Sequence, residues 1–493
     1  MKKPPFEALY GNSLALLTDV YQLTMAQGYW KSRIADRHAV YHLFFRKKPF
    51  GGSYAIAAGI ETFTQFVENF RYSESDLSYL ESIEDSEGRP LFEKGFLDYL
   101  KNFKFSVDID AVEEGTPVFP YEPLIRVQGP IIEAQLLETP LLNIVNFQTL
   151  IATKASRICQ AAENDEVVEF GVRRAQGIDG AISAGRAAYI GGVEATSTVL
   201  VGKLFGVPLR GTQAHSWIMA FDNESQSFDE YAKIYPTHSF FLIDTYDSIQ
   251  GAKRAIEVAK RQTDPNFSLK GLRLDSGDLA YLSIEIRKML DEAGFEKTKI
   301  VASNELDEYL IRDLKQQGAK IDVWGVGTNL ITAKDQPALD GVYKLSAIEN
   351  EQGELTYKLK ISEQLVKVTD PGILQVRRFE CPNQGYLFDM IYDEKANIPK
   401  NPTLVAPLDP TSRYEVKEES AFKDLLIPLF RKGECVIAFP KLSEVREKAA
   451  LELNKFPPRV KRFLNPQPYF VGLEKKLYEK KIKLIDQIKR KKV

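Results

Sequence analysis

Polar and charged side chains follow a series of short apolar runs in the middle of the chain. Arg173 and Arg174 come just after the run EVVEF, and His215 comes shortly after VPLRG. Further along, the same arrangement yields Asp244, Asp247, Arg273, Asp275, Ser276, Asp278, Ser303, Asn304, Gly325, Gly327 and Thr328. Guanidinium groups pair with phosphate oxygens, and glycine-rich backbone exposes N–H groups that surround an anion. The residue types therefore predict a site for a phosphate-bearing ligand.

The apolar runs themselves are predicted to be parallel strands. They are EVVEF, VPLRG, SFFLIDTYD, GLRLDSGD, KIVASNELD, IDVWGVGTN and GVYKL, and segments of helical pattern such as 248–261 and 279–293 separate most of them. Alternation of strands with helices is typical of a parallel sheet, and a long series of such units indicates a closed or nearly closed β/α barrel. Because ligands bind at the carboxyl ends of such strands, the polar residues should meet at one edge.

The rest of the chain predicts an α/β protein of several parts. Residues 1–130 combine helical and alternating patterns and are expected to form an α+β sandwich domain, and the barrel is expected over 131–345. Alternation returns over 346–400, which predicts antiparallel strands that rejoin the first domain. Residues 401–493 are predicted to be a mainly helical C-terminal region.

Composition excludes several classes of protein. The 493 residues carry a formal net charge of -3 and only three cysteines, and no CxxC pair occurs. No apolar stretch approaches the roughly 20 residues that cross a bilayer, and the N-terminus lacks the apolar core of a signal peptide. We therefore expect a cytoplasmic protein without nucleic-acid or membrane partners. The basic end 475–493 is best explained as a docked terminal helix with solvated lysines.

Each candidate residue also has a structural explanation. The glycines of GVGTN could serve a turn, the acids of LDSGD could cap the next helix, and Arg173 could pair with a surface carboxylate. His215 could be a structural histidine, a general base or a phosphate acceptor, but a metal ligand is disfavoured because no His or Cys lies nearby in sequence. His38 and His42 occur in strand-like sequence and are interpreted as structural.

Two further groups widen the candidate site. Asp275 and Asp278 could hold Mg²⁺ through oxygen ligands or stabilise a developing cation. Phe170, and Tyr21 with Asp19 near the N-terminus, could enclose a flat heteroaromatic substrate, although core packing explains Phe170 equally well.

Taken together, these motifs resemble the nicotinate phosphoribosyltransferase family. The resemblance rests on TDVYQLTM (18–25), FRKKPFGGSYAIAAGIE (45–61), EFGVRRAQGIDGA (169–181), GTQAHSW (211–217), LRLDSGD (272–278), VASNELDE (301–308) and DVWGVGTNL (322–330), in family order. It implies the type II phosphoribosyltransferase fold, an α/β sandwich with an irregular β/α barrel. Two segments depart from the family pattern, Ala195–Thr198 and Pro371–Arg377.

The resemblance also implies a reaction and its residues. Nicotinate and 5-phosphoribosyl diphosphate would give nicotinate mononucleotide and pyrophosphate in NAD synthesis, with ATP hydrolysed through a phosphohistidine at His215 and with Mg²⁺ as cofactor. The pyridine would lie between Phe170 and Tyr21 of a second subunit in a homodimer with shared sites. The remaining implied catalytic or substrate-binding residues are Asp19, Arg173, Thr212, Arg273, Asp275, Asp278, Ser303, Asn304, Gly325, Gly327 and Thr328; direct metal ligands stay undefined.

Rival functions remain open at this point. A sister enzyme that uses nicotinamide would share the fold, but GTQAHSW and EFGVRRAQG are closer to the nicotinate branch. An Mg²⁺-dependent aldolase or phosphatase would need a Schiff-base lysine or more carboxylates at the strand ends. A non-catalytic nucleotide-binding protein is disfavoured because His215 and the LDSGD acids are both present.

Overall fold

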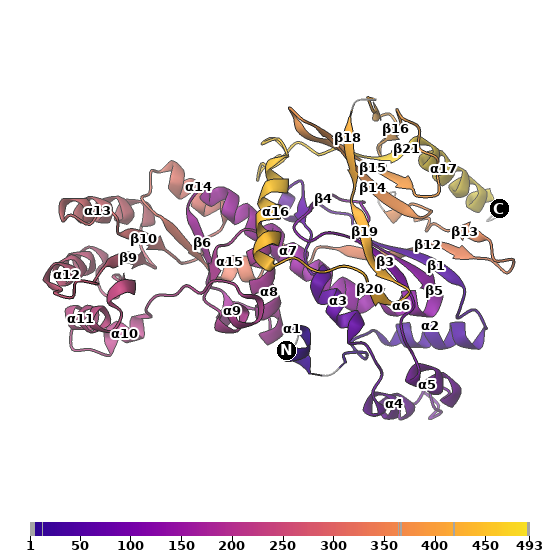
Figure 1. Ribbon diagram of the computed structural model, residues 1–493, viewed down its shortest axis with the longest axis horizontal. Helices are drawn as coiled ribbons and strands as arrows, with labels where there is room; N and C mark the ends of the chain where they lie inside the picture. Colours follow the sequence, from indigo (N-terminus) through magenta and orange to yellow (C-terminus); the bar gives the residue numbers. More distant parts are fainter. Residues whose placement is uncertain (1–4, 12, 363, 365–366, 418–419, 491–493) are drawn as a thin grey trace. The chain divides into compact units, whose positions relative to one another are not determined.

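The computed structural model describes residues 5–11, 13–362, 364, 367–417 and 420–490. The chain divides into two compact units, one made of residues 1–150 and 338–493 and the other of residues 151–337. The boundary falls within helix α7 (Glu138–Ala162), and the second unit contains the predicted strand-end residues from Arg173 to Thr328. Figure 1 shows the elements of both units.

The second unit is built on a six-stranded parallel sheet. In spatial order its strands are β7 (Ala195–Thr196), β6 (Glu166–Glu169), β11 (Val323–Val326), β10 (Lys299–Ala302), β9 (Leu269–Leu274) and β8 (Ser239–Leu242). Every neighbouring pair is parallel, which confirms the predicted strand–helix alternation. The sheet curls into an irregular half-barrel, in agreement with the predicted fold class.

Helices follow these strands along the chain. They are α8 (Ile178–Ile190), α9 (Val199–Phe205), α10 (His215–Met219), α11 (Glu224–Ile234), α12 (Ser248–Arg261), α13 (Leu279–Glu292), α14 (Glu308–Gln316) and α15 (Thr328–Ile331). Three of them begin in the same way, because Asp247, Asp278 and Asp307 accept a hydrogen bond from a backbone N–H of the first turn. Each aspartate is thus an N-cap, which ends the loop after a strand and starts the next helix.

The structure contradicts two of the predicted barrel strands, VPLRG and GVYKL. Within VPLRG only Leu209 forms a single bridge, to Thr196, so this run adds no full strand. The run GVYKL lies in β12 (Gly341–Glu349), which pairs antiparallel with β1 (His38–Phe45) in the other unit. Both runs are apolar and strand-like, and sequence pattern alone does not select the sheet that a strand joins.

The first unit contains two large sheets and a small one, mainly antiparallel. The seven-stranded sheet has the order β13 (Leu355–Tyr357), β12, β1, β5 (Ile125–Pro130), β3 (Asp108–Val112), β19 (Leu426–Arg431) and β20 (Glu434–Cys435). The six-stranded sheet has the order β17 (Arg413–Glu415), β16 (Thr403–Val405), β21 (Val471–Glu474), β15 (Gly385–Asp393), β14 (Leu374–Cys381) and β18 (Ala421–Asp424). The small sheet pairs β2 (Ala55–Ile56) with β4 (Pro117–Val118).

The helices of this unit are α1 (Pro5–Tyr10), α2 (Val20–Lys31), α3 (Ile60–Glu68), α4 (Glu74–Glu81), α5 (Lys94–Lys101), α6 (Ile131–Leu136), α16 (Leu442–Asn454) and α17 (Lys475–Arg490). Helix α17 confirms the predicted terminal helix, with Leu477 buried on one face and most of its lysines exposed. The prediction of a helical region over 401–493 is incomplete, however, because strands β16 to β21 also lie there. These strands are short and lie between turns, which hides their alternation in the sequence.

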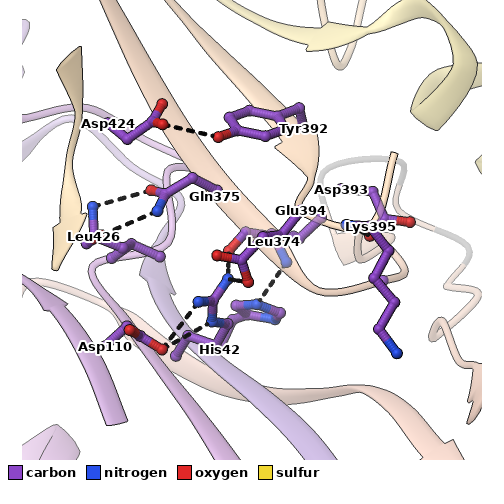
Figure 2. Close-up of polar contacts among 12 residues, drawn as sticks. His42, Asp110, Leu374, Gln375, Tyr392, Asp393, Glu394, Lys395, Asp424 and Leu426 are labelled. Carbon is purple, nitrogen blue, oxygen red and sulfur yellow. Dashed lines mark hydrogen bonds and ion pairs between the residues drawn. The ribbon is translucent and has the colours of Figure 1, made fainter. Parts of the chain in front are cut away.

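Side chains tie the start of β14 to the first sheet (Figure 2). His42 of β1 accepts a hydrogen bond at Nε2 from the N–H of Leu374, at 3.1 Å, and is almost fully buried. The side chain of Gln375 both donates to and accepts from the backbone of Leu426 in β19, each at 3.0 Å. The structural interpretation of His42 is thereby confirmed.

Candidate active site

Arg273 is the centre of a polar network at the carboxyl ends of the parallel strands. It stands near the end of β9, and its guanidinium donates to Thr212 Oγ1 at 3.0 Å, to Ser303 Oγ at 2.9 Å and to Asp275 Oδ1 at 2.9 Å. A further bond runs to the carbonyl oxygen of Gln213 at 3.1 Å. These bonds hold the fork in one orientation, so it can present a fixed positive charge to an anion.

Asp275 joins the arginine to the histidine. The hydroxyl of Ser303 donates to its Oδ1, and its Oδ2 lies 3.7 Å from His215 Nε2. Burial alone would raise the pKa of Asp275, but Arg273, Ser303 and His215 outweigh it and leave the pKa below its ordinary value. Asp275 is therefore a carboxylate at neutral pH, able to face a cationic centre.

His215 is oriented from its other side. Its Nδ1 lies 3.1 Å from Thr245 Oγ1, and 42% of its side chain is exposed. It is the first residue of α10, and its neighbours Thr245 and Asp275 follow β8 and β9. The structural alternative, in which a buried histidine donates to a backbone carbonyl, is not what these contacts show.

Asp244 positions the loop that carries Asp275, and no local feature of the sequence identified this role. Its Oδ2 accepts from the N–H of Asp275 at 2.8 Å and from the hydroxyl of Ser276 at 2.7 Å. Its Oδ1 is buried without a hydrogen-bond partner. The sequence placed Asp244 after a strand, but only the neighbouring positions of β8 and β9 show which loop it holds.

Phe170 packs between the sheet and the arginine. Its ring contacts the apolar cluster of Val168, Ala195, Val301 and Val323, and the guanidinium carbon of Arg273 lies 5.7 Å from the ring centroid. A Cβ at Gly325 would lie 2.5 Å from Phe170 Cε2. Gly325 is therefore glycine because the ring of Phe170 occupies the space that a side chain at position 325 would need.

The loop after β10 has an unusual backbone. Asn304 and Glu305 have φ angles of 86° and 37°, in the left-handed region that non-glycine residues seldom adopt. Asn329, which the sequence analysis did not select, holds this loop through bonds from Nδ2 to the carbonyl oxygens of Glu305 and Leu306, at 2.8 and 3.1 Å. Asn329 follows Thr328 in α15, so its two hydrogen bonds connect the GVGTN turn to the loop after β10.

Other predicted residues lie near these elements without joining the network. Arg173 and Arg174 are exposed on a 3-10 turn, Val172–Arg174, and neither has an ion pair among the described residues. Asp278 accepts from the N–H of Tyr281, which confirms the helix-cap interpretation for this residue. Gly327 lies directly before α15.

Asp19 and Tyr21 belong to the first unit. Asp19 precedes α2 and accepts a hydrogen bond from the Thr139 hydroxyl at 2.8 Å, and it makes no side-chain capping bond. Tyr21 is 47% exposed on the first turn of α2.

No cluster of three or more His, Cys, Asp or Glu side chains suited to a metal occurs in the part of the chain that the structure describes. Mg²⁺ does not need such a cluster, since it keeps several waters and binds through one or two carboxylates together with substrate phosphates. The carboxylate oxygens of Asp275 and the buried Oδ1 of Asp244, which has no hydrogen-bond partner, are donors that fit an ion of that kind.

Family models cover most of the chain. The model of the nicotinate phosphoribosyltransferase family matches residues 166–364, that of its N-terminal domain residues 16–146, and that of its C-terminal domain residues 375–481. Across the described residues no helix is both long and apolar enough to cross a membrane.

Individual proteins agree with these matches. Nicotinate phosphoribosyltransferase of Bacillus subtilis is 43% identical over 97% of this chain and 96% of its own length, and that of Caenorhabditis elegans is 36% identical over 94% and 92%. The crystal structure of human nicotinic acid phosphoribosyltransferase superposes with a TM-score of 0.83 at 30% identity, over 95% of this chain and 99% of the human one. With the half-barrel and its strand-end residues in place, these matches show that the chain belongs to the nicotinate phosphoribosyltransferase family.

Proposed function

We propose that this enzyme transfers the phosphoribosyl group of 5-phosphoribosyl diphosphate to nicotinate and couples the transfer to ATP hydrolysis through a phosphohistidine at His215. The products are nicotinate mononucleotide, pyrophosphate, ADP and phosphate, with one water consumed. The observation that carries the proposal is the chain of contacts from His215 through Asp275 to Arg273 at the strand ends.

His215 suits the role of phosphate acceptor. Its ring is 42% exposed, Thr245 orients it through Nδ1, and Asp275 lies beside Nε2, where it can stabilise a protonated or phosphorylated ring. Phosphorylation would add negative charge next to the Arg273 network and change how that network binds the sugar diphosphate.

Transfer at the anomeric carbon requires electrostatic support more than covalent help. The Asp275 carboxylate, whose pKa is lowered mainly by Arg273 against the effect of burial, can stabilise positive charge that develops on the ribose. Arg273 would bind the diphosphate, and Asn304 and the loop Gly325–Thr328 would bind the 5-phosphate through N–H and hydroxyl donors. Ser303 would lie beside that phosphate and could donate to it only by releasing the hydroxyl bond to Asp275.

The pyridine would lie against Phe170, with Arg173 near its carboxylate and Thr212 at the side of the sugar. Tyr21 and Asp19 would come from a second copy of the chain, which makes the functional unit a homodimer with shared sites. The exposed ring of Tyr21 supports this assignment. A sequence with only three cysteines and no CxxC pair supports a place in the reducing cytoplasm.

Mg²⁺ would neutralise charge on the diphosphate, and Asp275 and Asp278 would hold it together with substrate oxygens. Asp278 already uses one oxygen to cap α13. It would therefore contact the ion through a water molecule, or bind a ribose hydroxyl.

The test supplies the purified protein with 5-phosphoribosyl diphosphate, Mg²⁺ and either nicotinate or nicotinamide, with and without ATP. ATP-stimulated formation of mononucleotide and pyrophosphate from nicotinate is the expected result. Product from nicotinamide alone would favour the sister reaction, and no product from either pyridine would overturn the proposal.

The phosphohistidine needs its own variant. His215→Ala should lose ATP stimulation and acid-labile labelling by γ-³²P-ATP, while a slow ATP-independent synthesis remains. His238→Ala is the matched control, because His238 lies before β8 at the opposite ends of the strands. Retained ATP stimulation in His215→Ala would disprove the assignment.

A further inference from the structure

The carboxylate of Glu169 is fully buried at the end of β6, at 0% exposure. Its Oε1 accepts the N–H of Gly171, and its Oε2 accepts the hydroxyls of Thr196 at 2.6 Å and of Thr198 at 3.4 Å. Burying a carboxylate is costly unless such bonds compensate it. An apolar residue could close the end of this strand at lower cost, so the polar group requires another explanation.

The three bonds join two separate turns. Gly171 directly follows Phe170 and opens the turn that carries Arg173, whereas Thr196 ends β7 and Thr198 directly precedes α9. Thr198 is the residue before α9, yet its side chain makes no capping bond to that helix. Its hydroxyl faces Glu169 instead, and its N–H donates to Thr196 Oγ1 at 3.0 Å.

We infer that Glu169 is a positioning residue whose carboxylate fixes the Phe170–Arg173 turn to the β7–α9 segment and thereby sets the shape of the nicotinate-binding wall. This inference rests on the proposed roles of Phe170 and Arg173. Glu169 itself touches no reacting atom; it acts through the backbone of Gly171.

The Phe170–Arg173 turn is also restricted on the side away from Glu169. A Cβ at Gly171 would lie 2.6 Å from Ile331 Cβ and 2.8 Å from the carbonyl oxygen of Gly327. The turn therefore packs tightly against α15 and the residue before it, and it cannot move closer to that helix. The bond from the Gly171 N–H to Glu169 holds it from the side of β6.

A glutamine at this position would connect the two turns more weakly than the carboxylate does. The carboxylate accepts all three bonds, whereas an amide has one oxygen and one NH₂ group. If the amide oxygen accepts from the Gly171 N–H, the NH₂ group faces Thr196 and Thr198, and their hydroxyl hydrogens lose the acceptor that the carboxylate gave them. Burial also raises the pKa of Glu169, and the bonds from Thr196, Gly171 and Thr198 oppose that rise.

The first test compares Glu169→Gln and the milder Thr198→Val with Glu166→Gln. Glu166 is the control because it begins the same strand and pairs with Lys299 at 3.1 Å, away from the two turns. We expect both test variants to raise the KM for nicotinate, by about tenfold for Glu169→Gln, while the KM for 5-phosphoribosyl diphosphate changes less than about twofold. An unchanged nicotinate KM, or an equal rise in both KM values, would overturn the inference.

The second test does not depend on catalysis. Glu169→Gln should speed hydrogen–deuterium exchange over 170–177 and leave exchange over 299–302, in β10, unchanged. If the wild-type enzyme fails to use nicotinate, the proposed function fails. The exchange measurement would still decide whether Glu169 holds the Phe170–Arg173 turn to the β7–α9 segment. Unchanged exchange over 170–177 would contradict it, whatever the activity.

Discussion

His215 Nε2 lies 3.7 Å from Asp275 Oδ2, while the other oxygen of the same carboxylate accepts a hydrogen bond from Arg273. One side chain therefore connects the proposed phosphate acceptor to the proposed diphosphate clamp. A change of charge on the histidine acts on the arginine through a single, partly buried carboxylate. This arrangement offers a physical route by which phosphorylation could alter substrate binding.

Replacing Asp275 with asparagine should reduce kcat by roughly 10²- to 10³-fold, because it removes the negative charge that faces the ribose and leaves Arg273 without its ion-pair partner. Asp291→Asn is the control, since Asp291 pairs with Arg287 on the exposed face of α13. The measurement is steady-state kinetics with saturating nicotinate. A loss of less than about threefold would argue against a direct electrostatic role.

Gly325→Ala should impair nicotinate binding. The new Cβ would lie 2.5 Å from Phe170 Cε2, so the ring must shift, and overpacking of this kind costs about 1–3 kcal/mol of stability. We expect a higher KM for nicotinate and a lower melting temperature. Gly180→Ala in α8 is the matched control, since nothing lies within 4 Å of its added Cβ. An unaltered nicotinate KM in Gly325→Ala would show that the ring position does not affect binding.

A buried ion triad supports the same half-barrel. Glu308, the first residue of α14, pairs with Lys154 at 2.6 Å and Arg157 at 2.8 Å, and all three side chains are at most 2% exposed. Glu308→Gln removes the buried negative charge that both cations contact and should lower the free energy of unfolding by about 3–5 kcal/mol. Denaturant titration measures this, with Glu292→Gln as an exposed control at the end of α13.

The same triad should contribute to acid sensitivity. Burial raises the pKa of Glu308, but Lys154 and Arg157 outweigh it, so the folded-state pKa lies below the ordinary value of 4.5. Its stabilisation is present above that ordinary value and is lost as pH falls toward the folded-state pKa. Wild-type stability should therefore drop more steeply below pH 4.5 than that of Glu308→Gln, and parallel curves would contradict this.

His42 should produce a second pH effect, in a higher range. Burial, with a contribution from Arg126, lowers the pKa of His42 well below the ordinary value of 6.5 (Figure 2). Below pH 6.5 the unfolded chain binds a proton that the folded chain does not, so stability should fall as pH decreases from there. His42→Gln should flatten the melting temperature between pH 7 and pH 5 relative to wild type and to His38→Gln, and an unchanged slope would contradict this.

The sequence by itself determined the parallel strands and the chemistry at their ends. Apolar runs such as EVVEF and KIVASNELD are local patterns, and the polar residues that follow parallel strands must gather at one edge. Arg273, Asp275, Ser303 and His215 were selected in this way, and the structure joins them in one network. Helix caps such as Asp278 were equally readable, because capping depends on the next three residues of the chain.

Only the tertiary structure decided which strand neighbours which and what each buried polar group contacts. GVYKL has the same pattern as the barrel strands but pairs with β1, and two-residue β7 leaves almost no periodic signal. The roles of Glu169, Asp244 and Asn329 depend on partners from other strands or loops. A hydrogen bond forms between groups that are close in space, and sequence pattern records neighbours only within a few residues.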